Sequence, residues 1–148
     1  MPPTAATLPE WQVLLADLSK IGLSFLLAVP IGWNREHEEH SAGIRTFPIV
    51  AMATCGLTLA AASLPGAGPD SLSRVLQGMV AGIGFVGGGA ILRDKEGVHG
   101  TATAASVWSM GIAGACVGMG LYHVGIILSA INFITLKVLV PFKQFPKR

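Results

Sequence analysis

Charged residues are scarce in this sequence. Of its 148 residues, 10 are Lys or Arg and 8 are Asp or Glu, a charged fraction of 12%, against about 25% in an average soluble domain. Hydrophobic residues make up 51% of the chain, and the mean hydropathy is +0.61. So little charge cannot cover the surface of a water-soluble fold, and so much hydrophobicity excludes a disordered chain. The composition is that of an integral membrane protein.

Other scarcities narrow the classes of function. The net charge is only +2, and no basic patch alternates with aromatic residues, so we expect no nucleic-acid partner. Cys55 and Cys116 both lie in apolar runs, and we interpret them as buried thiols rather than as a disulfide or a metal pair. No nucleophile, base and acid stand in a catalytic pattern. We therefore expect neither an enzyme nor a cofactor.

Long apolar runs are the main positive signal. Each is 17 to 19 residues long, close to the ~20 residues that a helix needs to cross a ~30 Å hydrocarbon core. The sequence thus predicts an all-α, polytopic membrane helix bundle in a single transmembrane domain, with no soluble C-terminal domain after it. The predicted helices cover residues 14–31, 47–64, 76–92, 104–122 and 124–140.

The distribution of Lys and Arg predicts the orientation of these helices. The connections after the first and third runs and the C-terminal tail are rich in basic residues, whereas the opposite side has only Arg74, with Lys20 inside the first run. Cytoplasmic segments carry the excess of Lys and Arg. We expect a multi-pass protein of the bacterial inner membrane, with its N-terminus outside and its C-terminus in the cytoplasm.

Glycine is abundant, with 19 residues. Pairs of small residues four positions apart let membrane helices approach closely. We therefore predict that the run 76–92 is the packing centre of the bundle; the alternative is a broken helix that lines a cavity. A nucleotide site is not expected, because no strand or acidic residue accompanies the G-x-G-x-x-G letters. The predicted packing glycines are Gly78, Gly82, Gly84, Gly88, Gly114 and Gly118.

Two charged segments stand between predicted helices. One contains Arg35, Glu36, Arg45 and Thr46, and the other runs from Arg93 to Thr103. An Arg beside a helix N-terminus is a ready anion site, while the simpler interpretation is contact with lipid headgroups. An offset of 57 to 58 residues between the segments suggests a parallel repeat of two helical hairpins.

Smaller features of these segments add three expectations. Thr46 is a plausible N-cap of the second helix, and Thr101 or Thr103 of the fourth. The acidic cluster around His37 and His40 allows a weak magnesium contact, although a solvated, charge-rich loop is the simpler interpretation. The carboxylates concerned are those of Glu36, Glu38 and Glu39.

Three motifs carry a resemblance to a known family. They are Gly43-Ile-Arg45-Thr46, the glycine-rich segment 82–89, and Val98-His-Gly-Thr-Ala-Thr-Ala-Ala105 followed by Trp108. In order and spacing they resemble the MgtC/SapB family of bacterial inner-membrane proteins. The resemblance implies a five-helix membrane domain with its C-terminus inside and a role in adaptation to low magnesium. In some pathogens it also implies survival inside macrophages.

The resemblance also implies a mode of action. Better-studied members act as regulators of other membrane machines, including ATP synthase, rather than as transporters. The sequence departs from the family pattern at Asn34, where an acidic residue is usual, and at Thr101-Ala-Thr103, where Leu-Thr-Thr is usual. We also expect it to lack the soluble C-terminal domain that many members carry.

We therefore predict a regulator or adaptor that binds the lipid bilayer and other membrane proteins, with a homo-oligomer as a further option. The alternative is a magnesium or other ion transporter with Asp17, Lys20 and Asn132 facing a pore. A third option is lipid or phosphate handling through Arg35, Arg45 and Arg93. The functional candidates are Arg35, Glu36, Arg45, Thr46, Thr103 and Trp108.

Overall fold

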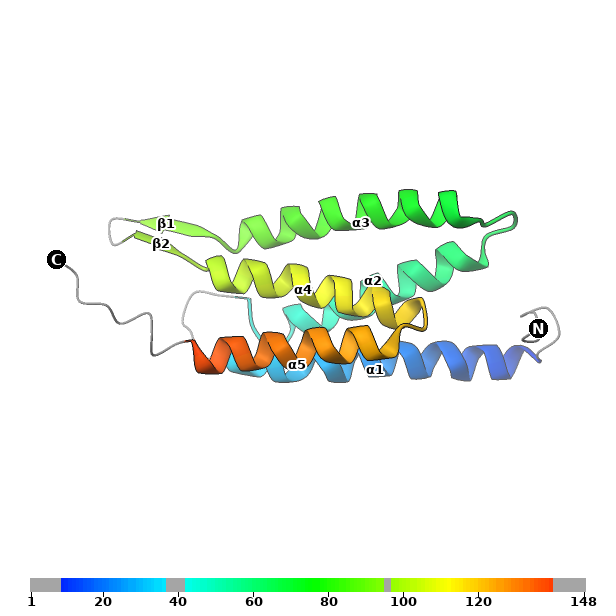
Figure 1. Ribbon diagram of the computed structural model, residues 1–148, viewed down its shortest axis with the longest axis horizontal. Coiled ribbons are helices and arrows are strands. Elements are labelled where there is room, and N and C mark those ends of the chain that lie inside the picture. Colours follow the sequence, from blue (N-terminus) through cyan, green and yellow to red (C-terminus); the bar gives the residue numbers. More distant parts are fainter. Residues whose placement is uncertain (1–8, 37–41, 95–96, 140–148) are drawn as a thin grey trace.

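The computed structural model describes residues 9–36, 42–94 and 97–139. In these residues the protein is all-α, with five helices and one short β-hairpin (Figure 1). The elements are α1 (Glu10–Glu36), α2 (Thr46–Ser63), α3 (Pro69–Gly89), β1 (Leu92–Asp94), β2 (Gly97–His99), α4 (Thr101–Gly118) and α5 (Tyr122–Val138).

The third helix differs most from its predicted range of 76–92. It begins at Pro69, because proline is favoured in the first turn of a helix. Ser71 Oγ also accepts a hydrogen bond of 2.9 Å from the N–H of Gly68. It ends at Gly89, and Leu92–Asp94 pairs with Gly97–His99 in an antiparallel hairpin, in which Arg93 lies opposite Val98. Hydropathy alone marks the apolar part of a helix and misses its polar first turn.

The predicted N-caps are wrong. Arg45 holds the N-cap position of α2, without a side-chain capping bond, and Thr46 is the first helical residue. At α4 the N-cap is Gly100, whose φ of +82° lies in the left-handed region that favours glycine. A Cβ atom at Gly100 would also collide with the carbonyl oxygen of Ala90. Gly100 therefore allows the hairpin to return closely against the end of α3.

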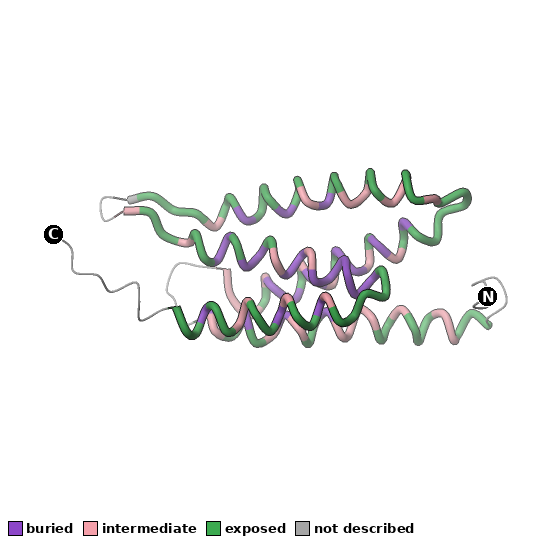
Figure 2. The backbone as a smooth tube through the Cα atoms, in the orientation of Figure 1, coloured by how far each residue is buried: buried purple, intermediate pink, exposed green. Residues whose placement is uncertain are grey.

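α4 is the packing centre of the bundle. It contacts all four other helices, and it is buried along most of its length, whereas α3 is mostly exposed (Figure 2). A Cβ atom at Gly118 would lie 2.8 Å from Thr58 Cβ and 2.9 Å from the carbonyl oxygen of Cys55. At Gly114 it would collide with the carbonyl oxygen of Ala51. The backbones of α2 and α4 can approach this closely because glycine has no side chain.

The prediction that the third helix is the packing centre is wrong for contacts within this chain. A Cβ atom at Gly78, Gly82, Gly84 or Gly88 would meet no atom within 4 Å. The only buried residues of α3 are Met79, Ile83 and Gly87, which follow one another at every fourth position. α3 thus packs through one narrow stripe, and its other glycines make no close contact within the described chain.

Two helical hairpins form the framework. α1 packs against α2 and α3 against α4, while α2 and α4 lie side by side at the centre (Figure 1). α2 and α4 run parallel, because Gly114 meets Ala51 and the later Gly118 meets the later Thr58. In addition α1 contacts α4, and α3 contacts α2. This pattern is that of two hairpins related by an approximate two-fold axis along the bundle.

The surface is strongly apolar. Large exposed side chains include Phe85, 85% exposed, and Leu14, 67% exposed. In the described residues α1 and α2 are long and apolar enough to cross a membrane, and α5 is a shorter apolar helix. So many exposed apolar side chains suit hydrocarbon better than water, which supports a membrane protein.

Candidate functional site

The connection between α1 and α2 is held by Glu36. Its Oε2 accepts a hydrogen bond of 2.8 Å from the N–H of Ile44. A Cβ atom at Gly43 would collide with the Glu36 carboxylate, and one at Gly32 would lie 2.9 Å from Ile44 Cα. A negative charge beside the start of α2 is also favoured by the dipole of that helix. The anion expected at this helix N-terminus is therefore the chain's own carboxylate.

Arg35 precedes Glu36 in the last turn of α1 and points in a different direction. It is 4% exposed, and its Nη2 donates to Asn34 Oδ1 at 3.2 Å. Burial of a guanidinium is costly unless polar groups surround it. Asn34 thus supplies a hydrogen-bond acceptor to Arg35. Arg35 faces the bundle while Glu36 faces outward.

The remaining candidates divide into two groups. Arg45 is exposed and Thr46 half-buried at the start of α2. Thr103, 1% exposed in the first turn of α4, lies at the same end of the bundle (Figure 1). Trp108 is 45% exposed on the outer surface of α4. The structure gathers Arg35, Glu36 and the α2 start at one end, and it leaves Trp108 outside that group.

Two interhelical hydrogen bonds were not foreseen from the sequence. Ser106 Oγ donates to Asn132 Oδ1 at 3.0 Å, and Ser129 Oγ donates to the carbonyl oxygen of Leu27 at 2.6 Å. The Nδ2 atom of Asn132 is buried without a hydrogen-bond partner among the described residues. These bonds join α5 to α4 and to α1. A Ser or Asn within an apolar run was the available signal, but it does not identify the partner.

The three polar residues proposed for a pore do not converge. Asp17 and Lys20 lie on the face of α1 that continues the line of buried Ser24 and Ala28. The Ser129–Leu27 hydrogen bond places Asn132 about one turn beyond Leu27. With a rise of 1.5 Å per residue, the position on α1 that is level with Asn132 lies roughly 15 Å from Lys20. Asn132 and the charged pair therefore occupy different depths of the bundle.

The described residues contain no group of three or more His, Cys, Asp or Glu that could hold a metal ion. Glu36 is engaged with Ile44, as above. The remaining members of the predicted acidic cluster, from His37 to His40, lie outside the described residues. A magnesium contact through Glu38 or Glu39 thus stays a prediction.

The five-helix fold and its apolar surface define the class: a helical membrane protein. The chain belongs to the MgtC family, whose model matches residues 21–145. It is 35% identical to Protein SrpB of Synechococcus elongatus over 145 residues, covering 86% of this chain and 78% of that protein.

Two further relatives carry the name MgtC. Protein MgtC of Brucella abortus is 34% identical over 111 residues, which cover 75% of this chain and 46% of the relative. Protein MgtC of Salmonella typhimurium is 31% identical over 113 residues, covering 76% and 48% respectively. The chain thus spans about half the length of these MgtC proteins. No solved structure matches the chain.

Proposed function

We propose that the protein is a non-enzymatic, multi-pass protein of the bacterial inner membrane that regulates other membrane proteins by binding them. The process that it serves is adaptation to low magnesium or related stress, as its MgtC family membership suggests. The observation that carries the proposal is the close packing around α4. Gly114 and Gly118 bring α2 and α4 into backbone contact, which leaves no room for an ion between these two helices.

The placement of polar groups supports a regulator over a transporter. An ion path through the membrane needs polar or charged side chains along its length. Asp17 and Lys20 lie near one end of α1, and Asn132 lies far from them and is engaged with Ser106. The exposed apolar side chains of α1, α3 and α5 offer contact surface to other helices instead.

The proposed orientation places the Glu36–Ile44 connection and the β-hairpin in the cytoplasm. Arg35, Arg45 and Arg93 are at this end of the bundle, and Arg74 is at the other. Excess Lys and Arg mark the cytoplasmic side. A cytoplasmic end of this kind also suits contact with anionic headgroups.

A flux measurement tests the proposal. The purified full-length protein is reconstituted in liposomes that contain a magnesium-sensitive dye, and Mg²⁺ entry is followed under an imposed gradient and potential. We expect no entry above that of empty liposomes, from protein whose helical circular dichroism shows that it is folded. Saturable entry would overturn the proposal if Asp17→Asn abolished it and Asp70→Asn, an exposed carboxylate at the start of α3, left it intact.

A magnesium or other ion transporter is the second candidate. Two observations favour it: the half-buried charges of Asp17 and Lys20 on the inward face of α1, and the unpartnered Nδ2 of Asn132. Glu36→Gln separates the two candidates further. A transporter that gathers Mg²⁺ at this carboxylate would lose flux, whereas a regulator would show none to lose.

A further inference from the structure

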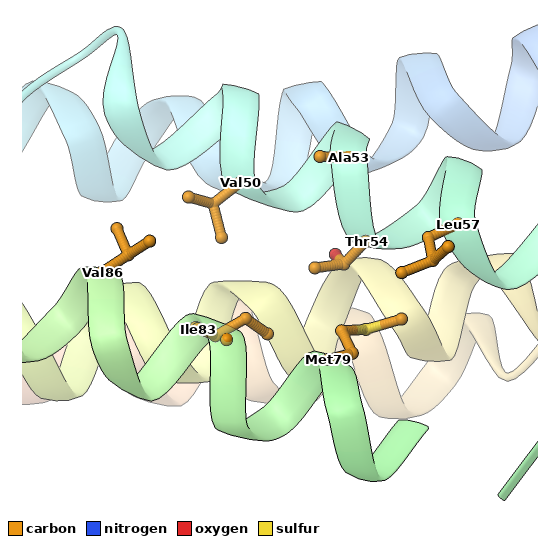
Figure 3. Close-up of a pocket in the computed structure, with 8 residues that line it drawn as sticks. Val50, Ala53, Thr54, Leu57, Met79, Ile83 and Val86 are labelled. Atoms are coloured by element: carbon orange, nitrogen blue, oxygen red, sulfur yellow. The ribbon is translucent and has the colours of Figure 1, made fainter. Parts of the chain in front are cut away.

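The α2–α3 groove is an apolar cavity of about 240 Å³ that opens between α2 and α3. We use the name for the space lined by Val50, Thr54 and Leu57 of α2 and by Met79, Gly82 and Ile83 of α3 (Figure 3). Thr54 is its polar member, and the hydroxyl already donates to the carbonyl oxygen of Ala51 at 3.0 Å. The groove therefore offers shape and apolar contact, without a hydrogen-bonding site for a polar ligand.

The two-hairpin framework indicates what fits this groove. Under the approximate two-fold axis, α1 corresponds to α3 and α4 corresponds to α2. The position between α1 and α4 is filled by α5, which packs against both. Its counterpart is the space between α3 and α2, which is the α2–α3 groove, and no helix of the described chain lies there (Figure 1). By correspondence with α5, the groove has the form of a helix-binding site.

Small residues allow α5 to pack in the position between α1 and α4. A Cβ atom at Gly125 of α5 would lie 3.0 Å from Val117 Cγ2 and 3.1 Å from the carbonyl oxygen of Ala113. One turn later Ser129 bonds to α1. A helix that enters the opposite groove would need the same property, a face of small residues at four-residue spacing.

α3 itself carries such a face beside the groove. Gly78, Gly82, Phe85 and Gly89 stand at positions i, i+4, i+7 and i+11, which share one side of a helix; we call these four residues the open seam. A Cβ atom at any of its three glycines would meet nothing within 4 Å, and Phe85 is 85% exposed. Glycine weakens a helix, and within the described chain no contact compensates for it at these positions.

We propose that a second copy of this chain binds here, with α3 of each copy lying in the α2–α3 groove of the other. A two-fold axis along the membrane normal makes the two α3 helices parallel and places seam against seam. Because both copies use the same surface in a two-fold interface, this single rotation axis buries the groove and the open seam of both copies. Each Phe85 then packs against the seam glycines of the other copy, as a large side chain opposite a surface without side chains.

The test measures dimerisation of the full chain in liposomes. Copies labelled with donor and acceptor dyes at the N-terminus are mixed over a range of protein-to-lipid ratios, and energy transfer gives the fraction of dimer. We expect Gly82→Leu and Phe85→Ala each to raise the protein density at half-dimerisation by about tenfold or more. Phe85→Ala truncates an exposed side chain, so the monomer fold is unaffected even if Gly82→Leu were to disturb it.

The matched control is Gly84→Leu. Gly84 is on the same helix and is equally open, but two residues from Gly82 it points to the other side of α3. We expect it to dimerise like the wild type. A wild type that stays monomeric at all densities would overturn the proposal, as would a Gly84→Leu variant that weakens dimerisation as much as Gly82→Leu does.

Cross-linking gives the geometry independently. With a copper oxidant, Phe85→Cys is expected to form a disulfide-linked dimer. Gly84→Cys, which lies about 100° around α3 from Phe85 and on the other side of the helix from Gly82, is expected to stay monomeric. Native Cys55 and Cys116 are buried, and cross-linking of the wild type measures the background that these two cysteines contribute. Equal cross-linking at positions 85 and 84 would contradict the interface. These outcomes are independent of Mg²⁺ flux, so the proposed regulatory role and the dimer fail or stand separately.

Discussion

α3 and α4 are both rich in glycine, yet they use it in opposite ways. On α4, a Cβ atom at Gly111, Gly114 or Gly118 would collide with a neighbouring helix. On α3, Gly78 and Gly82 have no neighbour within 4 Å. The same four-residue spacing of small residues thus marks the most buried helix of the bundle and its most exposed glycine-rich face. The pattern identifies a face suited to close packing, but it leaves open which helix, or which chain, packs there.

The largest expected effect comes from substitution on α4. Gly114→Leu places a side chain against the carbonyl oxygen of Ala51, which is part of the α2 backbone, and against the hydroxyl of Thr54. That hydroxyl donates a hydrogen bond to the same carbonyl oxygen. Overpacking of a close core contact costs about 1–3 kcal/mol and sometimes more, and we expect the upper end here because backbone must move. Unfolding in detergent, followed by circular dichroism, measures it.

Gly84→Leu on α3 is the comparison for that experiment. Its side chain would enter open space, so we expect no loss of unfolding free energy, and a gain of up to about 1 kcal/mol because glycine weakens a helix. Comparable losses at Gly114 and Gly84 would show that the contrast between the two helices is wrong.

The helix count, the all-α class and the apolar character followed from the sequence, because hydrophobic run length is a property of single segments. The contacts between segments did not follow. Glu36 meets Ile44 at a sequence separation of eight positions, and Ser106 meets Asn132 at a separation of 26. Each of these polar side chains had several partners available in the sequence. Only the register of α1, α4 and α5 selects among them.

The hairpin after α3 was missed for a related reason. Its strands are three residues each, and the charged segment from Arg93 to Glu96 is typical of a loop. The hairpin depends on Gly100, whose left-handed conformation and close approach to Ala90 let the chain turn back toward α3. A glycine can be read from sequence, but its φ cannot.

A smaller effect is expected from two substitutions within α3. Ile83 is 6% exposed and its side chain packs on Gly111 of α4, whereas Phe85 is 85% exposed. We expect Ile83→Ala to lower the unfolding free energy by about 2 kcal/mol, because truncation leaves a cavity. Phe85→Ala should change it little when measured at a dilution in detergent where the protein is monomeric. If Phe85→Ala were the more costly of the two, the single buried stripe of α3 would be wrongly assigned.

The smallest expected effect concerns the polar contact that ties α4 to α5. Ser106→Ala removes the donor to Asn132 Oδ1 and leaves the whole amide, including the already unpartnered Nδ2, without a partner among the described residues. Interhelical hydrogen bonds in membrane proteins contribute about 0.6 kcal/mol on average, with a maximum near 1.7. We expect Ser106→Ala to cost about 1 kcal/mol and Asn132→Leu to cost less, because the latter also removes the unsatisfied Nδ2. The double-mutant cycle from unfolding in detergent gives the coupling directly. Strict additivity of the two substitutions would mean that this hydrogen bond does not hold α5 in place, and that Gly125 and Ser129 alone fix its position against α1 and α4.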